Sequence, residues 1–146
     1  MSKPYHQLYV HCVWSTHHSR IRITPEIQEV LYPFLENKAK KFKCTILCMG
    51  GIEDHIHIAL RLSPARAVSD IVGKLKGSST YFLNKELQIT TDFDWQDGYG
   101  ALTFAQRDLK SIVMYIQNQK ERHATGKLNS RMEYIPNPSD PEVDEW

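Results

Sequence analysis

The stretch Cys44–Leu62, CTILCMGGIEDHIHIALRL, decides the fold. Two runs rich in β-branched and apolar residues lie on either side of Gly50-Gly51, a pair typical of a turn, which predicts a β-hairpin. Side chains alternate along a strand, so His55 and His57 project together while apolar residues take the opposite face. We expect helices to cover the apolar face and the imidazoles to lie on an open face of the sheet.

Working outward from the hairpin, hydrophobic periodicity predicts further strands and helices. Their order, β-α-β-β-α-β-α, predicts an α+β fold, a ferredoxin-like βαββαβ antiparallel sheet with an extra C-terminal helix. The expected strands are 5–16, 44–50, 55–62 and 99–105, and the expected helices are 26–42, 65–87 and 106–123.

The charge of the chain divides unevenly along its 146 residues. Residues 133–146 are rich in proline and carry five acidic side chains with no Lys or Arg, so residues 1–132 carry 18 basic and 12 acidic side chains. We expect a domain over residues 1–132 and an acidic tail over 133–146. The positive excess of the domain is compatible with a polyanionic partner.

Cysteine usage and hydropathy indicate a cytoplasmic protein. Cys12, Cys44 and Cys48 are too few for a disulfide framework, which indicates free thiols in a reducing compartment. The N-terminus has no apolar signal core, and no apolar run is long enough to cross a bilayer. We therefore expect no membrane partner.

The two strand histidines are the first candidates for a functional site. Neutral imidazoles at His55 and His57 can bind one cation together, although strand histidines also make ordinary hydrogen bonds. A second possibility is a structural zinc site, in which Cys44 and Cys48 join the histidines.

The last expected helix places Tyr115 and Gln119 one turn apart, beside its apolar face. The tyrosine can present its hydroxyl to a substrate, or it can be an edge residue with its ring packed and its oxygen in water. Two imidazoles and an amide oxygen around a divalent ion, with a phenol one turn away, are the parts that phosphodiester cleavage needs. Lys120 or Arg122 would favour the ionised phenol.

Four segments in order carry a family resemblance: DHIHIAL, IVGKLKGSST, WQDGYGALTF and YIQNQKERH. From about Tyr5 to His123, the chain resembles the HUH single-tyrosine transposases, which mobilise insertion sequences as single-stranded DNA. The resemblance implies a metal-dependent DNA strand transferase that cleaves and rejoins DNA at hairpin-bearing element ends. The alternatives are a hairpin-binding repressor and a catalytically inactive or domesticated relative.

The resemblance also implies a role for each candidate residue. Tyr115 would be the nucleophile, leaving a 5′-phosphotyrosine and a free 3′-OH. His55, His57 and Gln119 would bind Mg²⁺ or Mn²⁺. Family members are homodimers in which the tyrosine serves the histidine pair of the partner subunit, so a homodimer with composite active sites is expected.

Basic and aromatic side chains are the candidates for holding single-stranded or hairpin DNA. Each has a plainer interpretation, a solvated surface for the basic residues and core packing for the aromatic ones. The basic candidates are Lys74, Lys76, Arg107, Arg20 and Arg22, and the stacking candidates are Trp95 and Tyr99.

Overall fold

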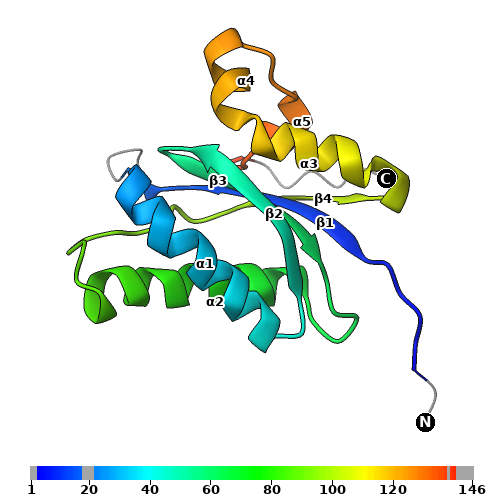
Figure 1. The fold of residues 1–146 in the computed structure, drawn as a ribbon, viewed down its shortest axis with the longest axis horizontal. Coiled ribbons are helices and arrows are strands. Elements are labelled where there is room, and N and C mark those ends of the chain that lie inside the picture. Colours follow the sequence, from blue (N-terminus) through cyan, green and yellow to red (C-terminus); the bar gives the residue numbers. More distant parts are fainter. Residues whose placement is uncertain (1–2, 18–21, 138, 141–146) are drawn as a thin grey trace.

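The structure, a computed structural model, describes residues 3–17, 22–137 and 139–140. A four-stranded antiparallel sheet in the order β2-β3-β1-β4 lies between two layers of helices (Figure 1). This confirms the expected α+β class with an antiparallel sheet. The strands are β1 (Tyr9–Ser15), β2 (Thr45–Ile52), β3 (His55–Arg61) and β4 (Gly100–Phe104).

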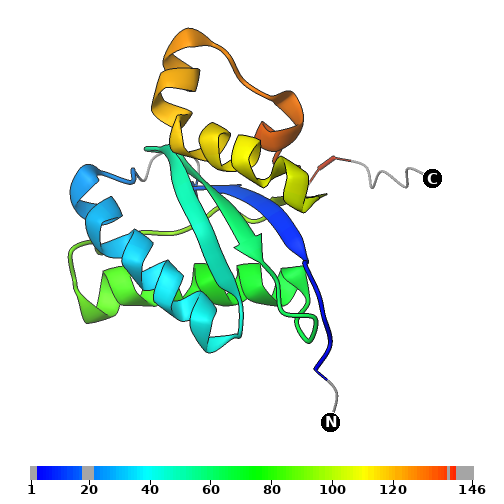
Figure 2. The ribbon, with the colours of Figure 1, turned by 45° about the vertical axis from the view of Figure 1, so that its right-hand side comes forward.

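The helices divide between the two faces of the sheet. The first two long helices cover one face, and the C-terminal helices cover the other (Figure 2). Within the described ranges, no helix is long and apolar enough to cross a membrane. The helices are α1 (Pro25–Lys41), α2 (Val68–Tyr81), η2 (Phe82–Glu86), η3 (Gln106–Asp108), α3 (Leu109–Gln117), α4 (Gln119–Thr125) and α5 (Ser130–Glu133).

The apolar face of β3 lies under α1 and α2, as the alternation predicts. Ile56, Ile58 and Leu60 are at most 1% exposed and belong to the main hydrophobic core. Thr24 starts α1 by accepting a hydrogen bond from the backbone N–H of Ile27, a side-chain cap of the kind that begins a helix. Packing of these residues in the core fixes the orientation of β3, and His55 and His57 therefore point away from α1 and α2.

The imidazole face of the sheet is covered, so the expectation of an open face is wrong. His55 is 8% exposed and His57 is fully buried. The layer α3–α5 packs over them, with α3 lying against β2 and β3. The C-terminal helices therefore cover the histidines, and their side chains contact them.

The expected turn at Gly50-Gly51 is also misplaced. β2 continues through both glycines to Ile52, and the turn is formed by Glu53 and Asp54. An irregularity between Ile46 and Cys48 shifts the register of β2, which leaves Gly50 opposite His57. A β-carbon on Gly50 would overlap the backbone carbonyl of Ile116 in α3. The glycine is therefore needed for close helix packing rather than for a turn.

We expect Gly50→Ala to destabilise the protein by about 1–3 kcal/mol, because the added methyl group forces α3 away from the sheet. Thermal unfolding measures the effect as a fall of several °C in Tm. The control is Gly73→Ala, since a β-carbon at Gly73 in α2 meets no atom within 4 Å and alanine is the better helix former. Equal Tm values for the two variants would contradict this account of the α3 contact.

The single helix expected over 106–123 is three elements. η3 leads into α3, and the helix breaks at Asn118, whose φ and ψ are −100° and 22°. α4 follows and ends at Gly126, which has a positive φ of 70°. Helical periodicity alone does not reveal such a break, because the apolar positions on either side keep their spacing.

The zinc alternative is not formed in the described part of the chain. Cys44 is buried and directly precedes β2, at the end of the hairpin away from the histidines, since Thr45 pairs with Arg61 and Ile52 with His55. Its Sγ instead accepts a hydrogen bond from the backbone N–H of Ser63, 3.5 Å away. Cys44 is a core residue.

Candidate active site

The two histidines of β3 point their Nε2 atoms toward one carboxylate. His57 Nε2 lies 3.0 Å from Oε2 of Glu133, and His55 Nε2 lies 3.4 Å from the same oxygen. The opposite nitrogen of each ring has a different partner. Nδ1 of His55 is 2.7 Å from Asp54 Oδ1, and Nδ1 of His57 is 2.8 Å from His11 Nε2.

Glu133 is held over the imidazoles by the short helix α5. The side chain of Asn129 caps this helix by accepting hydrogen bonds from the backbone N–H groups of Arg131 and Met132. Met132 is buried and anchors the helix. The expected boundary between residues 132 and 133 falls inside α5, so Glu133 packs with the domain rather than with the residues that follow it.

Tyr115 joins the same carboxylate from α3. Its hydroxyl donates to Oε1 of Glu133 at 2.6 Å and accepts a hydrogen bond from the backbone N–H of Asn129 at 3.0 Å. The ring lies edge-on to that of His57, with centroids 5.9 Å apart. The guanidinium carbon of Arg122 lies 4.6 Å from the centroid of the Tyr115 ring. One chain therefore places the phenol beside its own imidazole pair.

Gln119 lies at the start of α4 and is 1% exposed. Its Oε1 is 3.3 Å from Nε2 of His55 and 3.0 Å from Nε2 of His123. His123 thus helps to hold the amide with its oxygen toward Nε2 of His55. The break at Asn118 does not separate Gln119 from Tyr115, since the Gln119 amide donates to the Tyr115 backbone carbonyl.

Burial and charge shift the pKa values of the acidic groups in this cluster. Burial alone would raise the pKa of Glu133, but hydrogen bonds from His55, His57 and Tyr115 hold it well below its usual range. Burial and the hydrogen bond to Glu133 both raise the pKa of Tyr115. The resting phenol is therefore neutral and the carboxylate beside it is ionised.

The two β3 histidines shift in opposite directions. Burial lowers the pKa of His55, but hydrogen bonds with Asp54 and Glu133 outweigh it and bring the value to about 9. Burial lowers the pKa of His57, and this effect is larger than the attraction of Glu133. Burial likewise lowers the pKa of His11, to about 4. His57 and His11 are thus neutral rings.

A divalent cation fits the centre of this cluster. The ligand atoms of His55, His57 and Glu133 lie within 4.8 Å of one another. The Nε2 atoms of His55 and His57 lie 3.4 and 3.0 Å from Oε2 of Glu133, close to the separation of about 3 Å between two ligands at right angles on one ion. Within the described residues, no other group of His, Cys, Asp and Glu side chains is arranged in this way. Two imidazole nitrogens, a carboxylate and an amide oxygen form a mixed donor set.

A cavity of about 330 Å³ lies beside the cluster. His55, Glu133, Asp54 and His123 contribute to its walls, together with Ser15, Ile52, Leu128 and Ile135. A substrate in this space would reach His55 and Glu133, two of the proposed cation ligands.

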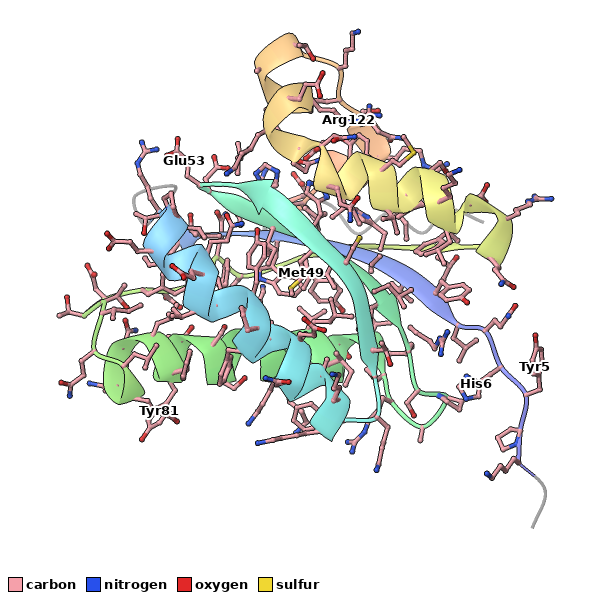
Figure 3. The ribbon with its side chains drawn as sticks, in the orientation of Figure 1. Tyr5, His6, Met49, Glu53, Tyr81 and Arg122 are labelled. Carbon is pink, nitrogen blue, oxygen red and sulfur yellow. The ribbon has the colours of Figure 1, made fainter. Side chains whose placement is uncertain are left out.

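The four basic candidates for DNA binding that the structure describes do not gather in one place. Arg20 lies outside the described residues, and exposed Arg22 forms an ion pair with Glu53. Arg107 is exposed on η3, in the layer that holds Tyr115. Lys74 and Lys76 belong to α2, which covers the other face of the sheet. In Figure 3, Tyr81 labels the end of α2 and Arg122 labels α4 in the opposite layer.

The two lysines of α2 make contacts within the protein. Lys74 lies near Asp70 and over the ring of Phe42. Lys76 donates to the backbone carbonyls of Gln96 and Gly98, at 3.0 and 2.6 Å, and pins the loop before β4. Burial lowers the pKa of Lys76 in spite of nearby aspartates.

The two aromatic candidates pack against the core. Trp95 is 5% exposed, and its indole N–H donates to the hydroxyl of Ser79 at 2.9 Å. Tyr99 is partly buried and packs against the main hydrophobic core. The plainer interpretation of these residues as core packing is the one the structure supports.

Four members of the site were not predicted from the sequence: Glu133, His11, Asp54 and His123, which contacts Gln119. Glu133 was assigned to the acidic tail, although Asn129 followed by four helix-compatible residues is a cap signal that marks α5. His11 could have been found by alternation, because it shares a face with Val13, which pairs with His57. Asp54 carries no signal beyond its position next to His55.

The chain is similar to known proteins in both sequence and fold. The family model described as IS200-like transposase matches residues 4–119. The ISDra2 transposase TnpA of Deinococcus radiodurans is 26% identical over 123 residues, which cover 80% of this chain and 87% of that protein.

Two solved structures share the fold, each with a TM-score of 0.60. A crystal structure assigned as a transposase from Deinococcus radiodurans R1 is 24% identical and covers 82% of this chain and 98% of its own. The structure of a REP-associated tyrosine transposase bound to a REP hairpin is 12% identical and covers 100% of this chain and 96% of its own.

Proposed function

Because the chain belongs to the IS200-like transposase family, we propose that it cleaves and rejoins single-stranded DNA at hairpin-bearing ends, with Tyr115 as nucleophile. The observation that carries the proposal is the convergence of Tyr115, His55 and His57 on the single carboxylate of Glu133. The hairpin bound to the REP-associated transposase of the same fold supports the substrate class.

Attack by Tyr115 on the DNA phosphate forms a bond between its phenolic oxygen and phosphorus and breaks the bond from phosphorus to the 3′ oxygen. The phenol proton leaves along its 2.6 Å hydrogen bond to Glu133 and passes on to solvent, because the lowered pKa of this carboxyl does not let it keep the proton. The departing oxygen takes up a proton to become a 3′-OH. The products are a 5′-phosphotyrosine and a free 3′-OH. Reversal with another 3′-OH rejoins the strand without an outside energy source.

His55 and His57 would hold a divalent cation, Mg²⁺ or Mn²⁺, together with Glu133 and the amide oxygen of Gln119. When bound, this ion supplies Lewis-acid stabilisation of charge on the phosphate. Arg122, stacked on the Tyr115 ring, favours the ionised phenol because its guanidinium is permanently positive. The basic side chains of residues 1–132, Arg107 among them, would hold the DNA backbone.

We expect the purified protein to form a covalent adduct with single-stranded hairpin DNA in the presence of Mn²⁺ or Mg²⁺. A label at the 3′ end of the DNA follows the fragment that remains attached through its 5′ phosphate. A denaturing gel should show the labelled fragment moving with the protein, and EDTA should abolish it. Hairpin binding with no cleavage in either metal would instead identify a repressor or an inactive relative.

A further inference from the structure

Each of the two imidazoles at the proposed cation site has a partner behind it. Nδ1 of His55 contacts the carboxylate of Asp54, which can accept a hydrogen bond in any state of the site. Nδ1 of His57 contacts Nε2 of His11, 2.8 Å away. Ligand imidazoles are commonly held in this way, because a bond at the far nitrogen fixes the ring and its tautomer. His57 differs from His55 because its partner is a second imidazole, which can either donate or accept.

His11 lies in β1 on the same face as His57 and is 1% exposed. It pairs in register with Ala59, whose small side chain leaves room for the two rings, with centroids 5.1 Å apart. Its Nδ1 has no hydrogen-bond partner among the described residues. An unpaired buried polar atom costs about 1–3 kcal/mol, so His11 is a poor choice for packing alone.

The tautomer of His57 depends on what its Nε2 faces. Opposite the ionised carboxylate of Glu133, Nε2 carries the hydrogen and Nδ1 offers a lone pair, which accepts from Nε2–H of His11. A cation bound at Nε2 requires the lone pair there. The hydrogen of His57 must then be on Nδ1, and it needs an acceptor in a buried place.

We propose that His11 is a positioning residue for the cation site, whose hydrogen bond with His57 reverses direction when His57 takes up a metal ion. The hydrogen on His57 Nε2 leaves to solvent, the hydrogen between the rings passes from His11 Nε2 to His57 Nδ1, and His11 takes up a hydrogen from solvent at Nδ1, on the side of the cavity that this ring lines. Each ring keeps one hydrogen, so the pair changes direction without a net gain or loss of protons. This inference rests on the metal site of the proposed function.

The unpartnered Nδ1 of His11 fits this role. An ionised carboxylate in this place could only accept, whereas an imidazole can donate or accept through the same ring atom, Nε2. Nδ1 of His11 must carry a lone pair in the metal-free state and a hydrogen in the metal-bound state. A fixed hydrogen-bond partner at Nδ1 would favour one of these two states over the other.

Two substitutions at His11 separate hydrogen bonding from packing. His11→Gln keeps a side chain that can donate or accept, and His11→Leu fills the space with no polar atom. Val13→Ala is the control, because Val13 is buried on the same face and pairs with His57 but makes no polar contact. Binding of Mn²⁺ alone is followed by the electron paramagnetic resonance signal of the free ion, and Tm confirms folding.

We expect His11→Leu to weaken Mn²⁺ binding by about 10–100-fold, as loss of the partner of a ligand imidazole does. His11→Gln should bind within about threefold of the unchanged protein, since it keeps one hydrogen bond of ordinary strength. Ring ¹⁵N resonances of His57 should report hydrogen on Nε2 in the metal-free protein and on Nδ1 with saturating Mg²⁺.

Three results would overturn the proposal while leaving the metal site intact. These are unchanged Mn²⁺ binding by folded His11→Leu, equal losses for His11→Gln and His11→Leu, and a His57 hydrogen on Nδ1 in both states. Failure of the unchanged protein to bind Mn²⁺ would overturn the metal site and this inference together.

Discussion

Tyr115→Phe should form no covalent adduct with hairpin DNA, a loss of at least about 10³-fold in cleavage rate, because the attacking atom is gone. The substitution removes one oxygen and leaves the ring between His57 and Arg122, so the fold and DNA binding should persist. The measurements are adduct formation on a denaturing gel with 3′-labelled DNA, and hairpin binding by a gel shift.

The matched control is Tyr134→Phe. Tyr134 follows Glu133, is 54% exposed, and bonds to Asp140 rather than to the site, so its loss should leave adduct formation unchanged. An adduct formed by Tyr115→Phe at the normal rate would remove Tyr115 from the mechanism.

Mixing two defective proteins identifies which subunit supplies the tyrosine. The structure brings Tyr115 to His57 of its own chain, which supports assembly within one chain, whereas the family resemblance implies a homodimer with composite sites. Tyr115→Phe mixed with His57→Ala should stay inactive if each chain serves itself. Restored adduct formation in the mixture would instead show that a tyrosine acts on the histidines of its partner.

The sequence predicts the sheet and the two histidines well because both depend on local periodicity. The alternation of His55, Ile56 and His57 specifies which side chains share a face, whatever the rest of the chain does. The order of elements then restricts the topology to few solutions. Alternation does not predict which elements cover each face of the sheet. For that reason the sequence does not predict that α3–α5 pack over the imidazoles.

The errors occur where a long-range contact overrides a local signal. Gly50-Gly51 is a strong turn pattern, yet Gly50 is required by the backbone of Ile116, 66 positions along the chain. Glu133 looks like one acid among five in a proline-rich tail, and only the packing of α5 shows that it faces His57. Neither contact has a local pattern that periodicity could detect.

Glu133→Gln should weaken Mn²⁺ binding by at least about tenfold and lower the rate of adduct formation by about 10²-fold. The amide keeps the size of the side chain but removes its charge, which lowers attraction for a cation between His55 and His57. It also removes the group that accepts the proton of Tyr115. Both losses act in the same direction, and calorimetry with Mn²⁺ separates the first from the second.

Glu121→Gln is the control, since this acid is exposed on α4 and its loss should change neither measurement. Gln119→Ala tests the amide ligand in the same assays; we expect a smaller loss of Mn²⁺ affinity than for Glu133→Gln because an uncharged oxygen binds a cation less strongly. Tighter Mn²⁺ binding or faster cleavage by Glu133→Gln would contradict the prediction, since the carboxylate would then be occupying the place of the cation rather than binding it.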